Sequence, residues 1–267
     1  MGKNSPIGVF DSGVGGLTVV KALLEELPEE NFIYFGDTAN VPYGNKSKQQ
    51  LFEYAHDIIN FLINRGVKAI VVACGTHSSV TLPDIADQYS IPLLGVVKAG
   101  SRSATKITNN GRIGIAATSA TVNSRAYTRE IQQTNPDYQV FETACPHFVP
   151  LVESGNLDGK EVRNAVQEYL DPLMDHGIDT LVLGCTHYPF LTPVIKEFVG
   201  KDVNLIDPSY ETINDLKGIL ARQQLYAVGN EEPLREFYVS GNDDSFYKVG
   251  NLLIGNAIRK VNKIVLD

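Results

Sequence analysis

Short apolar runs alternate with longer amphipathic stretches along most of the chain. The apolar runs are nearly continuous, which is typical of parallel strands buried on both faces, whereas the stretches between them have helical periodicity. One helix is expected to begin at Ser47, because Gln50 lies at capping-box spacing, and to end near Arg65. The predicted strands are Ile7–Phe10, Phe32–Phe35, Ala69–Ala73, Leu93–Val97, Arg112–Ala116, Gln139–Glu142, Thr180–Leu183 and Val203–Ile206. The other predicted helices end near Leu27, run from Cys74 toward Ser90, and lie near Thr121–Thr134, Val162–Met174 and Pro193–Val199. This alternation predicts parallel α/β sheets with helices on both faces.

Two of the predicted strand ends resemble each other. The segment 69–77 (AIVVACGTH) and the segment 180–187 (TLVLGCTH) are both apolar strands that end in Cys, followed by Thr and His. Cys74 and Cys185 are 111 residues apart in the sequence, which is about the length of one domain. The sequence therefore predicts two similar halves, with a cysteine at the same place in each.

Composition narrows the classes of protein to consider. The chain has 267 residues, of which 43% are hydrophobic and 20% charged, as expected for one large or two modest globular domains. It carries 31 acidic and 23 basic residues with no Lys/Arg cluster, which disfavours a nucleic-acid partner or an anionic membrane surface. The longest apolar runs fall far short of the ~20 residues of a membrane span. Three cysteines and an N-terminus without a signal-peptide pattern indicate a reducing compartment, the cytoplasm.

The glycine-rich segment 8–16 (GVFDSGVGG) suggests dinucleotide binding but lacks the full fingerprint. The third glycine of the fingerprint would fall at Thr18, and no phosphate-binding P-loop is present. The simpler interpretation is a tight turn whose backbone amides, at a helix N-terminus, hold a carboxylate.

The cysteines and histidines admit three interpretations. Cys74, His77, Cys185 and His187 could bind zinc, although neither of the usual ligand spacings occurs. Burial as a small hydrophobe is the commonest fate of a free cysteine, and we expect it for Cys145. For Cys74 and Cys185 a chemical role is favoured, because a following helix N-terminus and nearby His lower a thiol pKa from about 8.5 toward neutrality. His187 is placed to exchange a proton with Cys185 or to orient it. His56 and His176 are expected at the surface or in packing, and the role of His147 stays open.

Two thiols on similar halves could face one carbon atom from opposite sides, as in a two-base racemase. Four segments carry a resemblance to such enzymes: 8–18 (GVFDSGVGGLT), 35–44 (FGDTANVPYG), 145–153 (CPHFVPLVE) and 183–189 (LGCTHYP). With these segments the chain resembles the glutamate racemases of the aspartate/glutamate racemase superfamily over nearly its whole length.

The resemblance implies an α/β fold of two pseudo-symmetric, doubly wound domains with parallel sheets facing each other across a cleft. Residues 1–97 and 208–267 would form the first domain and residues 98–207 the second. The implied activity is interconversion of L- and D-glutamate without cofactor or metal, supplying D-glutamate for peptidoglycan in a bacterial cytoplasm. A homodimer is expected from base rates.

The resemblance also assigns roles to individual residues. Cys74 and Cys185 would be the catalytic thiols, with Asp11 assisting Cys74, and with His187, supported by Glu153, assisting Cys185. The implied substrate-binding residues are Ser12, Pro42, Tyr43, Gly44, Gly75, Thr76, Thr118 and Thr186.

The chain departs from the family pattern beside the first thiol. The family has Asn and Ala where this chain has Gly75 and His77, and its Pro-Gly-Ala is replaced by Ala99-Gly100-Ser101. If the missing Asn side chain limits the reaction, Gly75→Asn should raise glutamate turnover, and His77 could compensate only if its ring reaches the cleft rather than the core. Two alternatives therefore stay open. One is a related racemase, isomerase or decarboxylase for another small carboxylate, and the other is a catalytically silent paralogue that binds an amino acid or a protein partner.

Overall fold

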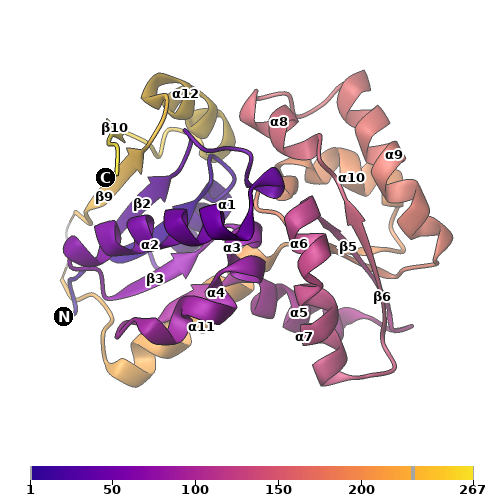
Figure 1. Cartoon of the computed structure of the whole chain (residues 1–267), viewed down its shortest axis with the longest axis horizontal. Helices are drawn as coiled ribbons and strands as arrows, with labels where there is room; N and C mark the ends of the chain where they lie inside the picture. Colours follow the sequence, from indigo (N-terminus) through magenta and orange to yellow (C-terminus); the bar gives the residue numbers. More distant parts are fainter. Residues whose placement is uncertain (1, 230–231, 267) are drawn as a thin grey trace.

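The strands of the computed structural model, which describes residues 2–229 and 232–266, form two separate parallel sheets. Figure 1 shows them as two halves lying side by side. The first sheet has the order β10-β9-β2-β1-β3-β4 and the second the order β6-β5-β7-β8. The strands of the first sheet are β1 (Ile7–Asp11), β2 (Phe32–Gly36), β3 (Ala69–Val72), β4 (Leu93–Gly95), β9 (Arg235–Val239) and β10 (Asn262–Lys263). Those of the second are β5 (Arg112–Ala117), β6 (Gln139–Ala144), β7 (Thr180–Leu183) and β8 (Asn204–Ile206). The predicted α/β class with parallel sheets is confirmed.

The two sheets repeat one topology. The order β2-β1-β3-β4 in the first sheet matches β6-β5-β7-β8 in the second, strand for strand in chain order. Cys74 follows β3 and Cys185 follows β7, so the two cysteines occupy equivalent places in the repeat. The two similar sequence segments, 111 residues apart, are therefore equivalent parts of two halves with the same topology.

Helices cover both faces of each sheet because buried strands send alternate side chains to opposite sides. In the first sheet, Val9 packs with Leu23 in one cluster, whereas Phe10 packs with Ile58 in another. The first half contains α1 (Leu17–Glu26), η1 (Tyr43–Asn45), α2 (Lys48–Asn64), α3 (Gly75–Val80), α4 (Leu82–Ile85), η2 (Ala86–Gln88) and α12 (Asp243–Ile254). The second contains α6 (Ser119–Ser124), α7 (Ala126–Thr134), α8 (Phe148–Glu153), α9 (Lys160–Asp175), η3 (Tyr188–Leu191) and α10 (Thr192–Val199). Helices α5 (Val96–Ile107) and α11 (Pro208–Gln223) lie in the two segments that connect the sheets, and they pack against each other.

Several elements differ from the sequence prediction. The capping box at Ser47 is present, and α2 ends one residue before the predicted Arg65. The helix predicted from Cys74 to Ser90 is divided into α3, α4 and η2, and the one predicted near Thr121–Thr134 is divided at Arg125, whose φ is +54°. The predicted domain boundaries, 97/98 and 207/208, fall where the chain crosses between sheets, and they stay a prediction.

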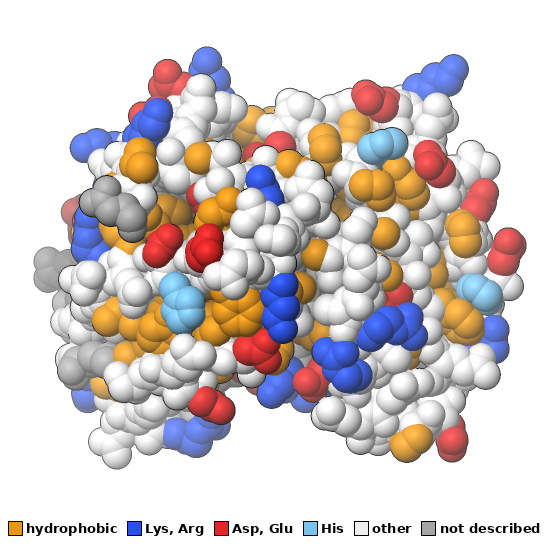
Figure 2. All heavy atoms as spheres, in the orientation of Figure 1, with side chains coloured by type: hydrophobic (Ala, Val, Ile, Leu, Met, Phe, Trp, Pro, Cys, Tyr) orange, Lys and Arg blue, Asp and Glu red, His pale blue; other side chains and the backbone are white. Residues whose placement is uncertain are grey.

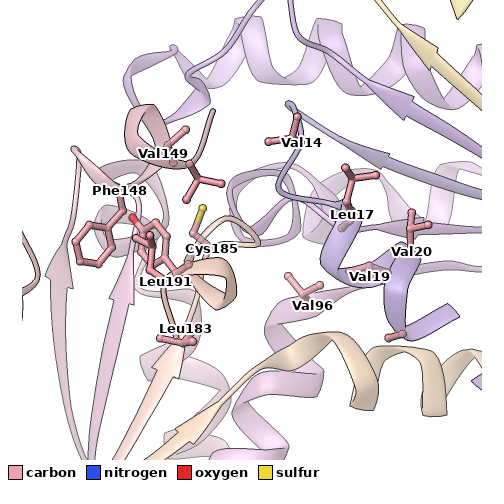
Figure 3. Close-up of a cluster of buried hydrophobic side chains, with 14 of the residues drawn as sticks. Val14, Leu17, Val19, Val20, Val96, Phe148, Val149, Leu183, Cys185 and Leu191 are labelled. Carbon is pink, nitrogen blue, oxygen red and sulfur yellow. The ribbon is translucent and has the colours of Figure 1, made fainter. Parts of the chain in front are cut away.

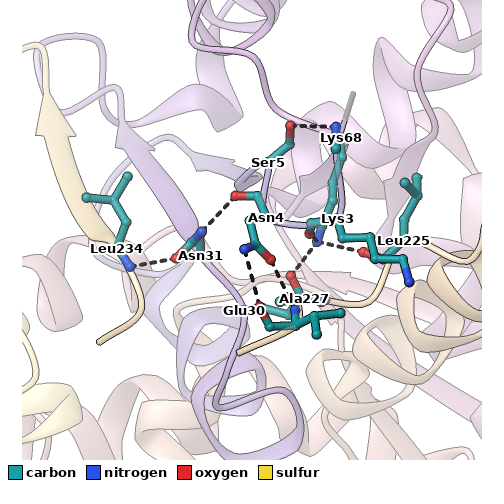
Figure 4. A network of polar contacts seen from close by, with 11 residues as sticks. Lys3, Asn4, Ser5, Glu30, Asn31, Lys68, Leu225, Ala227 and Leu234 are labelled. Atoms are coloured by element: carbon teal, nitrogen blue, oxygen red, sulfur yellow. Dashed lines mark hydrogen bonds and ion pairs between the residues drawn. The ribbon is translucent and has the colours of Figure 1, made fainter. Parts of the chain in front are cut away.

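A buried ion pair lies at the amino ends of the first sheet, away from the strand ends that carry the cysteines. Lys68 Nζ is 2.5 Å from Glu30 Oε2 and also donates to the backbone carbonyls of Lys3 and Leu225. The other oxygen of Glu30 accepts from the backbone N–H of Ala227. Figure 4 shows how this network joins the start of the chain to the segment after α11. Because the ammonium and carboxylate are fully partnered, their burial is tolerated.

Charged side chains of both signs lie on the surface (Figure 2). Figure 2 shows acidic and basic groups interspersed over both halves of the face in view. In the part of the chain that the structure describes, no helix is long and apolar enough to cross a bilayer.

Candidate active site

The predicted functional residues gather at the carboxyl ends of the strands, where open parallel sheets bind ligands. Asp11 is the last residue of β1, and Cys74 lies two residues beyond the end of β3. In the second half, Thr118 follows β5 directly, and Cys185 lies two residues beyond β7. Because the two sheets meet with these edges together, the short polar segments of both halves enclose one space.

That space is a cavity of about 150 Å³. This is room for roughly five waters, the size of a small ligand rather than of a dinucleotide. Both halves contribute to its wall, so a bound molecule would lie between the sheets. The predicted residues that line it are Asp11, Ser12, Pro42, Tyr43, Gly44, Cys74, Thr76, Thr118, Cys185, Thr186 and His187.

The predicted and observed cavity walls differ at seven residues. Gly75 and Glu153 are not among the lining residues, although each is in contact with residues that are. Sequence reasoning missed five others: Asn45, Ser119, Cys145, Pro146 and Val149. Three of the five could have been found, because Cys145 and Pro146 follow β6 at the same edge and Ser119 adjoins Thr118.

A hydrogen-bonded chain supports Cys185. Its Sγ lies 3.7 Å from Nδ1 of His187, whose Nε2 lies 2.6 Å from Oε1 of Glu153. The same carboxylate oxygen accepts from the backbone N–H of Val14 at 2.9 Å. The glycine-rich turn therefore does hold a carboxylate, as predicted, but the carboxylate belongs to Glu153 of the other half. Burial alone would lower the pKa of His187, but its hydrogen bonds to Cys185 and Glu153 prevail and raise that pKa well above its usual range. The imidazole is therefore protonated at neutral pH.

The first thiol has a different environment. Burial raises the pKa of Cys74 well above its usual range, and the nearby charge of Asp11 adds to that rise. The lowered pKa predicted from the following helix is wrong for Cys74, because desolvation outweighs the backbone N–H groups of Thr76 and His77. Burial also raises the pKa of Asp11, against the opposing effect of His187. Asp11 accepts from the Thr186 hydroxyl at 3.1 Å, which connects the two halves.

His77 faces the core. Its ring is fully buried and lies edge-on to Tyr43 and Phe10, and Nδ1 contacts the hydroxyl of Thr81. Burial lowers its pKa to about 3, so the ring is neutral. The four residues considered as zinc ligands do not form a group that could hold a metal ion. Among residues 2–229 and 232–266, no three His, Cys, Asp or Glu side chains are grouped so that they could hold a metal ion.

The remaining histidines and the third cysteine lie mostly as predicted. Cys145 is fully buried, as expected of a packing residue, although it also forms part of the cavity wall. His56 contacts Tyr89, and His176 stacks on Phe141. His147, left open by the sequence, is exposed and binds the hydroxyl of Tyr169 at 2.7 Å.

Apolar side chains surround the second thiol. Figure 3 shows Cys185 beside Val149 and Leu191 of its own half, with Val14 and Leu17 of the other half opposite. All five belong to one buried cluster that extends across both halves. Apart from the cavity that it lines, Cys185 is therefore buried in an apolar environment, which strengthens the electrostatic interactions of its sulfur.

Fold and site together define a class of α/β protein in which two similar halves present one thiol each to a small shared cavity. Comparison with known proteins identifies that class. A sequence profile of the Asp/Glu/Hydantoin racemase family matches residues 7–215. The chain belongs to this family.

Its similarity to glutamate racemases extends over nearly the full length of the chain. The chain is 45% identical to the glutamate racemase of Neisseria meningitidis serogroup A, over all of this chain and 98% of that one. It is 42% identical to the glutamate racemase of Geobacter metallireducens, over 98% and 97% of the two chains. Among solved structures, the glutamate racemase of Francisella tularensis in complex with D-glutamate superposes with a TM-score of 0.92, at 38% identity over 99% of each chain.

Proposed function

We propose that this chain interconverts L- and D-glutamate by passing a proton through two thiols, without a cofactor. One observation carries the proposal: Cys74 and Cys185 occupy equivalent places in two repeated halves and line one small cavity. The chain is 42% and 45% identical to two glutamate racemases over 98% and 100% of its length, which supports glutamate as the substrate.

The reaction conserves protons. One sulfur, as thiolate, removes the α-proton from one face of the amino acid and becomes a thiol. The other, as thiol, gives its proton to the opposite face and becomes a thiolate. The carbon is inverted, and the two sulfurs have exchanged protonation states, so the reverse reaction starts from the state that the forward one leaves.

The surroundings of the two sulfurs suit these unequal roles. The raised pKa of Cys74 keeps its proton on sulfur, as a donor requires. The protonated ring of His187, held by Glu153, would stabilise negative charge on Cys185. Asp11, close enough to raise the pKa of Cys74, would assist that thiol.

A thiolate is a weak base for an amino-acid α-proton, so the cavity must stabilise the carbanion. Hydroxyls of Ser12, Thr76, Thr118 and Thr186 line it and would bind the substrate carboxylate as charge flows onto it. The backbone at Tyr43-Gly44, following Pro42, would hold the opposite end of the amino acid. Enclosure between the halves excludes water, which strengthens these interactions.

Proton NMR of L- and D-glutamate in D₂O tests the proposal. We expect the α-proton signal to disappear as the opposite enantiomer accumulates. Cys74→Ser and Cys185→Ser should each lower racemisation at least about 100-fold, since removing a positioned acid or base costs about 10²–10⁴-fold. Thermal unfolding of each variant controls for folding. Turnover near that of the wild type in either variant would contradict the two-thiol mechanism, and racemisation of another amino acid instead of glutamate would contradict the substrate.

We further propose that the product supplies peptidoglycan synthesis in a bacterial cytoplasm and that the chain is a homodimer. The bacterial relatives and the three free cysteines support the first proposal, and the prevalence of twofold oligomers supports the second. Growth of a depleted strain on added D-glutamate and light scattering of the purified protein test them. Growth that D-glutamate fails to restore, or a monomeric mass, would contradict the respective proposal.

A further inference from the structure

Three glycines of the first half lie against the second half where a side chain has no room. A Cβ on Gly13 would lie 2.0 Å from Oε1 of Glu153, and one on Gly15 would lie 2.3 Å from Nδ1 of His187. A Cβ on Gly75 would lie 2.3 Å from the carbonyl oxygen of Gly184. Real Cβ atoms do not approach other atoms this closely, so each glycine permits direct contact between the halves.

Gly75 differs from the other two glycines because the atom nearest to an added Cβ would belong to the backbone rather than to a side chain. Glu153 and His187 are side chains, which can rotate away from an added methyl group. The carbonyl of Gly184 is backbone, and it lies at the end of β7 in the middle of the second sheet. A side chain at position 75 would therefore have to displace one half relative to the other.

This contact is also adjacent to both thiols. Gly75 directly follows Cys74, and Gly184 directly precedes Cys185. Two hydrogen bonds hold the halves together on the same side: Thr76 Oγ1 lies 2.9 Å from Thr118 Oγ1, and the Ser79 hydroxyl donates to Thr121 at 3.2 Å. The backbone contact and these hydroxyl bonds together fix how closely the two cysteine-bearing turns approach.

We propose that Gly75 is a positioning residue that sets the distance between the sulfurs of Cys74 and Cys185. It does so through the backbone, because its missing side chain lets the two turns meet. The inference deepens the proposed racemase function and rests on it. It also reverses the expectation from the family pattern, since Gly75→Asn should lower turnover rather than raise it.

The size of the effect follows from the geometry. Ordinary contact for a Cβ begins at 3.4 Å, so a methyl group at position 75 requires the halves to separate by about 1 Å. A misplacement of that size between reacting groups can lower a rate ~10²-fold. Since the hydroxyls that line the cavity remain, substrate binding should suffer less than turnover.

The test compares Gly75→Ala and Gly75→Asn with Gly218→Ala, a control in α11 whose Cβ would meet only the end of the Arg222 side chain, at 3.3 Å. We expect kcat for racemisation to fall at least about tenfold in both directions for the Gly75 variants, with a smaller change in KM, and to stay unchanged for the control. A kcat within twofold of the wild type, or an increase for Gly75→Asn, would overturn the inference.

Crystal structures of the wild type and Gly75→Ala provide a readout that does not depend on activity. We expect the distance between the two sulfurs to increase by about 1 Å in the variant, and an unchanged distance would refute the positioning role. A wild type that fails to racemise glutamate would refute the proposed function instead, and the sulfur distance would still decide whether Gly75 sets the spacing.

Discussion

Replacing Glu153 by Gln isolates the charge behind the second thiol. The amide oxygen of Gln can still accept from Val14 and from His187, as the carboxylate does now. The geometry of the chain from position 153 to Cys185 is therefore kept, while the negative charge that stabilises the protonated ring is lost.

The expected loss in kcat can be estimated from the hydrogen bond between His187 and residue 153. A hydrogen bond to a charged group contributes about 1.5–3 kcal/mol, against about 0.5–1.5 kcal/mol for a neutral one. The loss of about 1–2 kcal/mol corresponds to about a 5- to 30-fold lower kcat, if the charged form of His187 assists the reaction throughout. The near-complete burial of His187 favours the upper end of this range.

Glu153→Gln should also change how the rate and the stability depend on pH. Glu153 is one of the groups that raise the pKa of His187, so Gln at this position lowers that pKa, and the ring loses its proton at a lower pH. The alkaline limb of the pH–rate profile should move to lower pH. A raised pKa in the folded state contributes stability that is complete below the unfolded value near 6.5 and is lost as the pH rises through the folded value. The unfolded value is common to both proteins, so the stability difference between wild type and variant should shrink as the pH rises from the folded pKa of the variant to that of the wild type.

Circular dichroism at fixed substrate concentration follows racemisation from either enantiomer over this pH range. Glu168→Gln makes the same chemical change on the exposed face of α9 and serves as the control. If Glu153→Gln keeps kcat within twofold and leaves the alkaline limb in place, the charge of Glu153 has no part in the reaction.

Two further predictions concern stability. Lys68→Met should lower the free energy of unfolding by about 3–5 kcal/mol in urea titrations, because it leaves Glu30 buried without its cation; a loss below about 1 kcal/mol would contradict this. Tyr127→Phe should leave that free energy unchanged or raise it in the same titrations, because the Tyr127 hydroxyl is buried without a hydrogen-bond partner among the described residues; a loss above about 1 kcal/mol would show that the hydroxyl has a partner.

The sequence predicts the strands that carry the site because they are buried on both faces. Such strands are continuous apolar runs, and β1, β2, β3 and β7 are all of this kind. In contrast, β9 begins with Arg235 and Glu236, alternates in burial and lacks a clear apolar run, while β10 has only two residues. Both strands are stabilised by partners distant in the sequence, which a local pattern does not reveal.

The members of the site were easier to predict than their chemical state. Polar residues after apolar strands mark the wall of the cavity, so most of its residues were found. The pKa of Cys74 depends on how completely the other half covers it, and this burial is a property of the assembled halves. The close approach of Gly75 to Gly184 joins residues 109 positions apart, and no local pattern predicts it.

The way the chain divides between the sheets fixes the order in which they can be completed during synthesis. All four strands of the second sheet lie within residues 112–206, so that sheet can form as soon as this continuous segment has left the ribosome. The first sheet waits for β9, which pairs with β2 and is made last but one. Until then, β2, with the apolar sequence FIYFG, is an unprotected sheet edge. The half that carries Asp11 and Cys74 therefore passes through an aggregation-prone stage that the half carrying Cys185 avoids.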